Sequence, residues 1–362
     1  MLMREVQYHG APVTDEVIES FETCVQCRGC EPACPSGVPY GHLMERTRES
    51  LADQRLITPT WRRLALGPLS RPRLLRMGAR ALAVAQRLRL VPRRLGLSAR
   101  IPLRSAPLPV TGQDVYLLTG CVMDAFQRDV HRAAVEVLTA AGFGVTPTNE
   151  LAPCCGALHT HAGLAGEARH LAQQTIERLA SDRPVIVDSA GCGAAMKDYG
   201  HLLGTADAEA FAGRVYDVHE FLATHSDSLP EAEELDMRVA VQDPCHLRHV
   251  QGVHQATRSV LRPYVRELVE LDDDGLCCGA GGAYSLFEPE LAGDIRERKL
   301  GAIGRASADV VVSANPGCSL YLGAAEISTR HPIELVAEAL RASSRESNQR
   351  ARTKPTGPNS IP

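Results

Sequence analysis

Twelve cysteines occur in three groups of four, and the first group forms a compact motif near the N-terminus. It reads Cys-x2-Cys-x2-Cys-x3-Cys-Pro, a spacing typical of [4Fe–4S] ligation. Cysteines three residues apart in one loop can direct their thiolates toward different corners of a single cubane. We therefore predict a [4Fe–4S] cluster here, with a zinc knuckle as the alternative. The predicted ligands are Cys24, Cys27, Cys30 and Cys34.

The fourth ligand of this motif is ambiguous. In proteins with two such motifs, the cysteine before the proline ligates the other cluster, and no second run of this kind occurs in the sequence. Either Cys34 folds back to complete its own cluster, or another cysteine completes it. The beginning Met1-Leu2-Met3 leaves a third alternative, in which an upstream module is missing from the chain.

The other eight cysteines repeat one pattern: a single cysteine, an adjacent pair followed by glycine, and a further single cysteine. Adjacent cysteines do not easily form an unstrained disulfide with each other, so thiolate ligation suits them better. Buried structural thiols and a metal-free dithiol redox centre are the alternatives. The sequence predicts a second and a third cluster, one on each set. The sets are Cys121, Cys154, Cys155, Cys192 and Cys245, Cys277, Cys278, Cys318.

Near-constant spacing between these two sets indicates an internal duplication. The matching cysteines are 124, 123 and 126 residues apart, from Cys121 to Cys245, Cys154 to Cys277 and Cys192 to Cys318. In each half, an apolar strand precedes the first cysteine and a second strand ends near the last one. The predicted strands are residues 115–118, 185–187, 239–241 and 310–312, with a helix over 296–303.

Strands that alternate with helices favour parallel α/β sheets, whose ligands gather at the carboxyl ends of the strands. Each half is therefore expected to present four thiolates to one spot. The predicted fold is α/β, with a small helical ferredoxin-type module followed by two repeated cysteine-rich domains. The expected boundaries are 1–53 for the module, 54–110 for a basic helical connector, 111–232 and 233–342 for the repeats, and 343–362 for a disordered tail.

Composition sets the broad class of the protein. A chain of 362 residues accommodates two domains of ordinary size, and its 44% hydrophobic and 23% charged residues are typical of globular proteins. The net charge of −4 argues against a general nucleic-acid binder. We find no signal-peptide pattern and no apolar run of bilayer length, so we expect a cytoplasmic protein. Clustered cysteines in a reducing compartment indicate metal binding or redox catalysis.

The connector contains thirteen arginines between Arg55 and Arg104 and no Asp or Glu. Leu and Ala recur at near-helical spacing over residues 74–90, which predicts an amphipathic helix with a basic face. One interpretation is a solvated helix surface. The other is a docking face for an acidic partner or for an anionic membrane surface, and the sequence does not decide between them.

Histidines and aspartates near the cysteines offer further chemistry. His159, His161 and His246 could each replace a thiolate, as in Rieske centres, but a hydrogen bond to sulfur or to a carbonyl group is the expected role. Asp188 and Asp243 follow strands and could accept protons, but loop capping is the expected role. The sequence contains no P-loop, serine triad or HExxH motif.

Together these motifs resemble the iron–sulfur subunit of glycolate oxidase. The resemblance rests on the stretch from Cys24 to Met44, on both Cys-Cys-Gly sets, on Ser-Ala-Gly-Cys-Gly at 189–193 and on Asn-Pro-Gly-Cys at 315–318. It covers about residues 11–340. The repeated halves are also similar to the cysteine-rich domains of heterodisulfide reductase and of lactate-utilisation proteins.

The resemblance implies an electron-transfer subunit that works with an FAD-binding 2-hydroxyacid dehydrogenase, with the FAD on that partner only. Electrons from glycolate or lactate would leave the flavin, cross the clusters and reach a quinone or another acceptor that is neither NAD nor oxygen. Contact with the inner face of the membrane would be peripheral. A catalytic thiol or heterodisulfide reductase that binds substrate sulfur at a Cys-Cys-Gly cluster is the rival. A redox sensor or assembly scaffold is a third hypothesis.

Two departures from the family pattern bear on this interpretation. Glycolate oxidase subunits carry two ferredoxin-type motifs and this chain has only the second, which affects the expected length of its electron relay. In heterodisulfide reductase, the last cysteine of each set belongs to a Cys-x-x-Cys pair. Here Ala195 and Tyr321 stand three residues after Cys192 and Cys318. A five-thiolate non-cubane cluster is therefore not expected, while a four-thiolate cluster in each half stays open.

Overall fold

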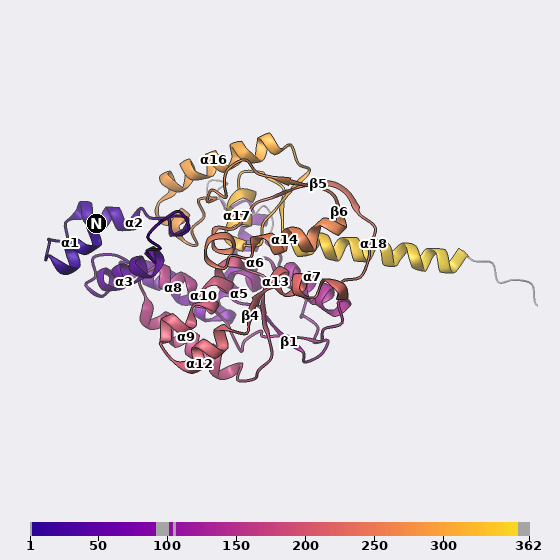
Figure 1. The fold of residues 1–362 in the computed structure, drawn as a ribbon, viewed down its shortest axis with the longest axis horizontal. Coiled ribbons are helices and arrows are strands. Elements are labelled where there is room, and N and C mark those ends of the chain that lie inside the picture. The colour runs from indigo at the N-terminus through magenta and orange to yellow at the C-terminus, as the bar shows by residue number, and fades with distance from the viewer. Residues whose placement is uncertain (1, 92–100, 104–105, 354–362) are drawn as a thin grey trace, which may run out of the picture.

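The computed structural model describes residues 2–91, 101–103 and 106–353, and it begins with a small helical module (Figure 1). Its helices are α1 (Leu2–Tyr8), α2 (Asp15–Glu22) and α3 (Tyr40–Asp53). The loop between α2 and α3 contains the four N-terminal cysteines. The apolar faces of the helices form a small core around Phe21, Met44 and Leu51. This core fixes the two ends of the cysteine loop.

The connector folds as two helices against the first cysteine set. Helix α4 (Thr60–Leu66) leads through the 3-10 turn η1 (Gly67–Ser70) into α5 (Pro72–Arg87). Leu66 and Leu69 are buried in a cluster that also contains Cys121 and Cys154. Helix α5 covers most of the helix predicted over 74–90, and residues 92–100 and 104–105 of the connector lie outside the described residues.

The first repeat is built on a parallel sheet of four strands in the order β2-β1-β3-β4. The strands are β1 (Val115–Leu118), β2 (Val145–Pro147), β3 (Val185–Val187) and β4 (Val215–Asp217). Strands β1 and β3 are buried along their whole length, as expected for a sheet covered on both faces. The helices are α6 (Val122–Phe126), α7 (Arg128–Ala140), α8 (Ala157–His161), α9 (Ala165–Arg178), α10 (Ala190–Lys197), α11 (Tyr199–Leu203), α12 (Ala206–Ala212) and α13 (Val218–Thr224).

The second repeat has the same topology, with strand order β6-β5-β7-β8 and parallel pairing. The strands are β5 (Leu235–Val241), β6 (Val265–Glu270), β7 (Val310–Val312) and β8 (Thr329–Arg330). The helices are the π-helical turn η4 (His246–Val250), α14 (His254–Leu261), α15 (Tyr284–Phe287), α16 (Pro289–Ala306), α17 (Pro316–Gly323) and α18 (Pro332–Thr353). The 3-10 turn η3 (Ser226–Ser228) precedes β5, and the 3-10 turn η5 (Arg262–Tyr264) precedes β6. The predicted duplicated α/β fold is confirmed.

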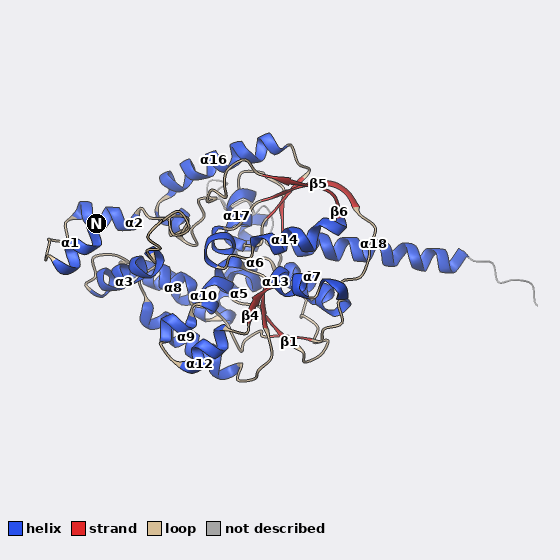
Figure 2. Cartoon of the chain, in the orientation of Figure 1, coloured by secondary structure: helices blue, strands red, loops and turns tan. Residues whose placement is uncertain are grey.

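Helices α7, α13, α14 and α18 form a layer between the two sheets (Figures 1 and 2). One continuous core runs through this layer from Leu117 of the first sheet to Val239 of the second, and it includes Leu138, Leu222 and Leu335. On the surface of the layer, Arg341 of α18 donates to Glu136 of α7 over 2.8 Å. The two repeats therefore share one hydrophobic interior.

Helix α18 continues beyond the second repeat into residues that the sequence analysis assigns to a disordered tail. Residues 343–353 are helical, and 354–362 lie outside the described residues. The helical extension follows from the buried anchor of α18, where Ile333, Leu335 and Val336 hold its first turns. Among the described residues, none of the helices is both long enough and apolar enough to cross a membrane.

Candidate functional site

The single cysteines of both repeats lie where strands lead into helices. Cys121 follows β1 and precedes α6, and Cys245 follows β5 and precedes η4. Cys192 and Cys318 lie in the first turns of α10 and α17, after β3 and β7. Because the N-terminus of a helix favours negative charge, α10 and α17 suit thiolates or an anionic group there. The parallel topology thus gathers these four thiols at the carboxyl edges of the sheets.

The glycine of each Cys-Cys-Gly turn is required by the backbone. Gly156 and Gly279 have φ of 83° and 86°, in the left-handed region that other residues avoid. A Cβ on Gly279 would lie 2.5 Å from the carbonyl oxygen of Ala292 in α16. The N–H of each glycine donates to the first thiol of its pair, over 3.5 Å to Cys154 Sγ and 3.4 Å to Cys277 Sγ. Both turns therefore orient the thiol and stabilise negative charge on it.

Within each repeat, the four thiols form a continuous hydrogen-bonded row. The rows run Cys121, Cys154, Cys155, Cys192 and Cys245, Cys277, Cys278, Cys318. Hydrogen bonding with Cys154, followed by burial, raises the pKa of Cys121 well above its ordinary value, and Cys277 acts in the same way on Cys245. Buried thiols this close cannot all ionise without nearby positive charge. The donor set therefore fits a cationic metal group.

Both rows line one cavity of about 540 Å³. The sequence predicts one spot for each half, whereas the structure gives the two halves a common space. Its wall is mostly apolar and includes Leu158 and Leu286, and it also contains Arg296 and Tyr321. The guanidinium of Arg296 lies 4.4 Å from the ring centroid of Tyr321. Tyr321, which replaces the second cysteine of a Cys-x-x-Cys pair, thus forms part of the cavity wall.

The N-terminal motif has a separate, smaller pocket of about 80 Å³. Its wall contains Cys24, Cys27 and Cys30 together with Gln26, Arg28, Tyr40, Gly41, Met44, Glu45 and His161. Cys34 lies outside this wall, where N–H groups of Val38 and Ser36 point at its thiol and lower its pKa. Three of the four predicted ligands therefore share one pocket. Ligation by all four stays a prediction.

The N-terminal cysteine loop packs close to the second repeat. Burial raises the pKa of Cys27, and the nearby thiol of Cys245 raises it further. A Cβ on Gly29 would lie 3.4 Å from Nε2 of His249 in the turn that follows Cys245. The small pocket is therefore adjacent to one end of the second thiol row.

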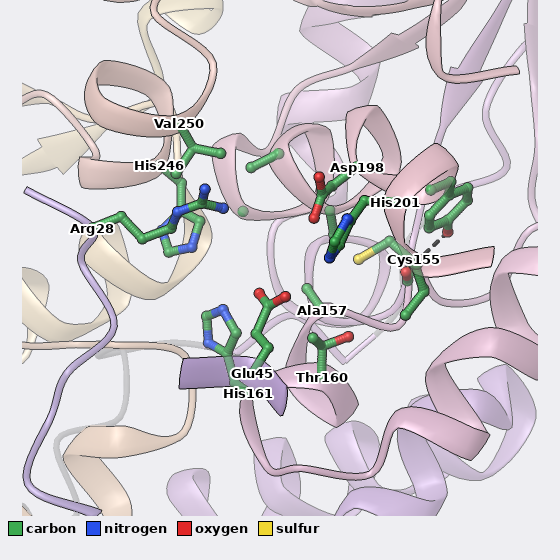
Figure 3. Close-up of a pocket in the computed structure, with 15 residues that line it drawn as sticks. Arg28, Glu45, Cys155, Ala157, Thr160, His161, Asp198, His201, His246 and Val250 are labelled. Carbon is green, nitrogen blue, oxygen red and sulfur yellow. Dashed lines mark hydrogen bonds between the residues drawn. The ribbon is translucent and has the colours of Figure 1, made fainter. Parts of the chain in front are cut away.

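A pocket of about 50 Å³ lies beside the small cysteine pocket and shares wall residues with it (Figure 3). In Figure 3, Glu45 and His161 stand side by side, with Arg28 and His246 opposite them and Asp198 further along the wall. Burial, helped by the charge of Asp198, raises the pKa of Glu45 to about 7. Burial, helped by His246, lowers the pKa of His161 to about 3, so this imidazole is neutral.

The other histidines near the cysteines contact sulfur, as the sequence analysis expects. Nδ1 of His246 lies 3.4 Å from Sγ of Cys245, and His159 forms a hydrogen bond with Cys154. Nδ1 of His159 and Nδ1 of His161 are both buried without a hydrogen-bond partner within the part of the chain that the structure describes. Of the two, His161 is in the wall of the small cysteine pocket.

The two aspartates have charged or histidine partners instead of the expected loop-capping role. Asp188 Oδ2 lies 2.6 Å from His131 Nδ1, with both side chains buried. Asp243 accepts from Arg258 over 2.8 and 3.1 Å. The partners of both carboxylates lie outside the local sequence. The local pattern therefore could not reveal them and indicated only a capping role.

Arg48 of α3 is a residue of this site that sequence reasoning missed. Its Nη2 donates to the carbonyl oxygen of Cys24 over 2.9 Å and to that of Phe21 over 2.6 Å, and its Nη1 donates to the carbonyl oxygen of His161 over 2.9 Å. One guanidinium therefore connects the cysteine loop with the first repeat. No local signal identifies this residue, since its partners are carbonyl groups 24 to 113 positions away.

Among the described side chains, no three from His, Cys, Asp and Glu converge closely enough to hold one metal ion. A zinc knuckle requires such convergence around a single ion. The ligands of an iron–sulfur cluster bind different iron atoms and need not converge on one point.

Helix α5 has an apolar stripe that faces solvent. Leu74, Met77 and Val84 recur on one side of the helix, and Leu88 follows directly after its end; they are 47%, 63%, 47% and 62% exposed. Exposed arginines repeat every seven residues alongside them, at positions 73, 80 and 87. The opposite side of α5 is buried at Ala79 and Ala83. We call the four apolar residues the exposed stripe of α5.

Comparison with known proteins identifies relatives over nearly the whole chain. The cysteine-rich domain family called CCG matches residues 115–197 and 239–323. The glycolate oxidase iron–sulfur subunit of Escherichia coli is 30% identical over 91% of this chain and 84% of its own length. The probable glycolate oxidase iron–sulfur subunit of Bacillus subtilis is 32% identical over 89% and 81%. Lactate utilization protein A of Geobacillus kaustophilus is 30% identical over 63% of this chain and 98% of its own length.

Proposed function

This chain belongs to the glycolate oxidase iron–sulfur subunit family, and from that premise we propose that it is the electron-transfer subunit of a 2-hydroxyacid dehydrogenase complex. Two electrons from glycolate or lactate reach the flavin of an FAD-binding partner subunit. They then pass singly through this chain to a quinone or another acceptor.

The observation that carries this proposal is the succession of thiol sites. The pocket of Cys24, Cys27 and Cys30 adjoins Cys245, which is one end of the second row. That row and the first row line one cavity, so no long insulating segment separates the three sites. This arrangement supports a relay in which an electron moves between neighbouring sites inside the protein.

Bound at these sites, iron–sulfur clusters would supply one-electron redox chemistry. Cys24, Cys27 and Cys30 would hold a [4Fe–4S] cluster, and each four-thiol row would hold another cluster. The N–H groups of Gly156 and Gly279 and the amide of Asn315 point at ligand sulfurs. Such donors stabilise the reduced, more negative state and thereby raise the reduction potential.

The exposed stripe of α5 supports peripheral contact with an anionic membrane surface. Apolar side chains that face solvent beside a row of arginines are typical of helices that lie in the interface of a bilayer. Residues 55–104 contain no Asp or Glu, and Glu150 of the first repeat is the carboxylate that pairs with Arg73 and Arg76 of this helix. A membrane position would bring the chain close to a quinone acceptor.

A second candidate function rests on the shared cavity. The cavity has a volume of about 540 Å³, and its wall contains both thiol rows and Arg296. A cavity of this kind could hold the substrate of a catalytic thiol or disulfide reductase. A relative from Methanothermobacter marburgensis, named as one of the subunits of a fumarate reductase (CoM/CoB), is 32% identical over 58% of this chain. Cluster spectra that change when a small disulfide is added to the isolated chain would favour this function.

Two anaerobic measurements test the proposed function. Iron and acid-labile sulfide should each reach about eight to twelve per chain, and Cys155→Ser and Cys278→Ser should each lower the iron content by about four. Adding a 2-hydroxyacid should then bleach the cluster absorbance only when the flavoprotein partner from the native host is present. Clusters that dithionite reduces, but that stay oxidised with every hydroxyacid and partner, would contradict an electron-transfer role.

A further inference from the structure

The N-terminal pocket presents three thiols where a cubane has four iron corners. Cys24, Cys27 and Cys30 lie in its wall and Cys34 does not. The thiol of Cys34 lies near main-chain N–H groups of its own loop. The same wall contains the thioether of Met44, which packs in the core of the N-terminal helices. It also contains three titratable side chains with a donor atom that can bind iron, namely Tyr40, Glu45 and His161.

The first two of these side chains are less suited to the open corner. Tyr40 forms a hydrogen bond with Cys24, so its hydroxyl is already engaged with one of the three thiols. Glu45 is a hard oxygen donor in a ligand set of soft thiolates. Its carboxyl group also lies in the neighbouring pocket near Asp198, and the charge of Asp198 disfavours a second carboxylate there.

His161 is held in place relative to the cysteine loop by two side chains. Gln26, between the first two cysteines of the motif, donates to the carbonyl oxygen of His161 over 3.1 Å. Arg48 donates to the same oxygen over 2.9 Å while it also holds the carbonyl group of Cys24. The position of the His161 backbone is therefore coupled to the loop that carries the three thiols.

The imidazole of His161 has an unused ligand function. Its Nδ1 is buried and lacks a hydrogen-bond partner among the described residues, as does Nδ1 of His159. His159 is not in the wall of this pocket, and His246 contacts Cys245 of the second row. A buried polar atom without a partner costs free energy unless a group absent from the protein chain satisfies the site. A neutral imidazole is also the form that binds iron.

We propose that His161 is the fourth ligand of the N-terminal cluster, which Cys24, Cys27 and Cys30 hold at its other three corners. This inference rests on the proposed function only in requiring that the motif binds a [4Fe–4S] cluster. Cys34 is then free of that cluster. Because a neutral imidazole replaces a thiolate, the cluster is less negative by one charge and is easier to reduce than an all-cysteine cluster.

The test uses the full chain, purified anaerobically and reduced with dithionite, so that it needs neither partner nor substrate. With 15N-labelled histidine, pulsed electron paramagnetic resonance should detect a strongly coupled nitrogen in the wild-type protein. His161→Ala should abolish that coupling, and His170→Ala, on the exposed surface of α9, should leave it unchanged. His161→Cys should retain the full iron content and lower the reduction potential of this cluster. Cys34→Ser should keep both the iron content and the nitrogen coupling.

Two results would overturn the assignment while leaving the proposed function intact. One is a nitrogen coupling that survives in His161→Ala. The other is the loss of about four iron atoms in Cys34→Ser while His161→Ala keeps the wild-type spectrum. A wild-type protein that binds no iron at all would overturn both proposals. Far-ultraviolet circular dichroism of each variant separates loss of a ligand from loss of the fold.

Discussion

The carboxylate of Asp188 lies 2.6 Å from Nδ1 of His131, and neither side chain reaches solvent. Nε2 of the same imidazole lies 2.9 Å from the carbonyl oxygen of Thr119, so both ring nitrogens have partners. The pair lies between the first sheet and α7, and Asp188 also lines the cavity of the two thiol rows. The Asp188–His131 pair therefore connects the cavity wall to the central helical layer.

This pair should make the stability of the protein depend on pH. Burial alone would lower the pKa of His131, but the charge and hydrogen bond of Asp188 outweigh it and raise the pKa above 6.5. A raised histidine pKa means that the stabilisation is complete below about pH 6.5 and is lost as pH rises through the folded-state value. The thermal midpoint of His131→Gln should therefore fall further below wild type at about pH 6 than at about pH 9. An equal difference in thermal midpoint between wild type and His131→Gln at both pH values would contradict this prediction. His170→Gln is the surface control.

Gly279→Ala should destabilise the second repeat. The substitution forces a residue with a Cβ into a left-handed conformation and places that carbon against the carbonyl oxygen of Ala292. We expect a loss of about 2 kcal/mol or more in the free energy of unfolding, measured by denaturant titration. Gly293→Ala on the neighbouring α16 is the matched control, because its Cβ would meet open space. It should raise stability by about 0.5–1 kcal/mol. Equal effects of the two substitutions would refute the explanation.

Arg48→Met should loosen the N-terminal module from the first repeat. It removes hydrogen bonds from a charged donor to the carbonyl groups of Phe21, Cys24 and His161. We expect a cost of about 3 kcal/mol in unfolding free energy and a loss of about four iron atoms per chain. Arg46→Met, on the exposed side of the same helix, should change neither quantity. Full iron content in Arg48→Met would show that the cysteine loop holds its shape without this guanidinium.

The exposed stripe of α5 should bind anionic vesicles. Co-sedimentation with phosphatidylglycerol-containing vesicles should decrease about tenfold in the double variant Leu74→Ser, Met77→Ser, because two apolar side chains no longer enter the interface. Val110→Ser, which changes an exposed apolar residue outside α5, should bind as wild type does. If the double variant sediments with vesicles as well as wild type, the stripe is not the membrane contact.

The sequence was sufficient to predict the central strands β1, β3 and β7 in full, but only residues 239–241 of the central strand β5 (Leu235–Val241). Residues 115–118, 185–187 and 310–312 are uninterrupted apolar runs and form β1, β3 and β7 at those positions. Edge strands are less visible, because they carry polar residues or are very short. Strand β6 reads VRELVE and β8 contains two residues, so neither produces an apolar run. The helical residues 343–353 were also missed, since their polar composition is equally compatible with disorder.

The candidate site was predictable to the extent that it follows from topology. A parallel sheet brings residues after successive strands to one edge, and this rule alone predicts that Cys121 and Cys192 approach each other. The common cavity depends on how two sheets pack across α7, α13, α14 and α18, which no local spacing encodes. The position of His161 beside Cys24 depends on Arg48, whose partners are main-chain carbonyl groups and therefore leave no trace in side-chain patterns.

The shared interior of the two repeats has a consequence for their independence. Since one core joins Leu117 of the first sheet to Val239 of the second, neither half can open without exposing the apolar surface of the other. The duplicated halves should thus melt as one cooperative unit, and the separation of the two thiol rows is set by solid-like packing and not by a hinge. A substitution of Leu138 or Leu335 in the buried layer should then alter the positions of both thiol rows together. The two thiol rows therefore belong to a single folding unit.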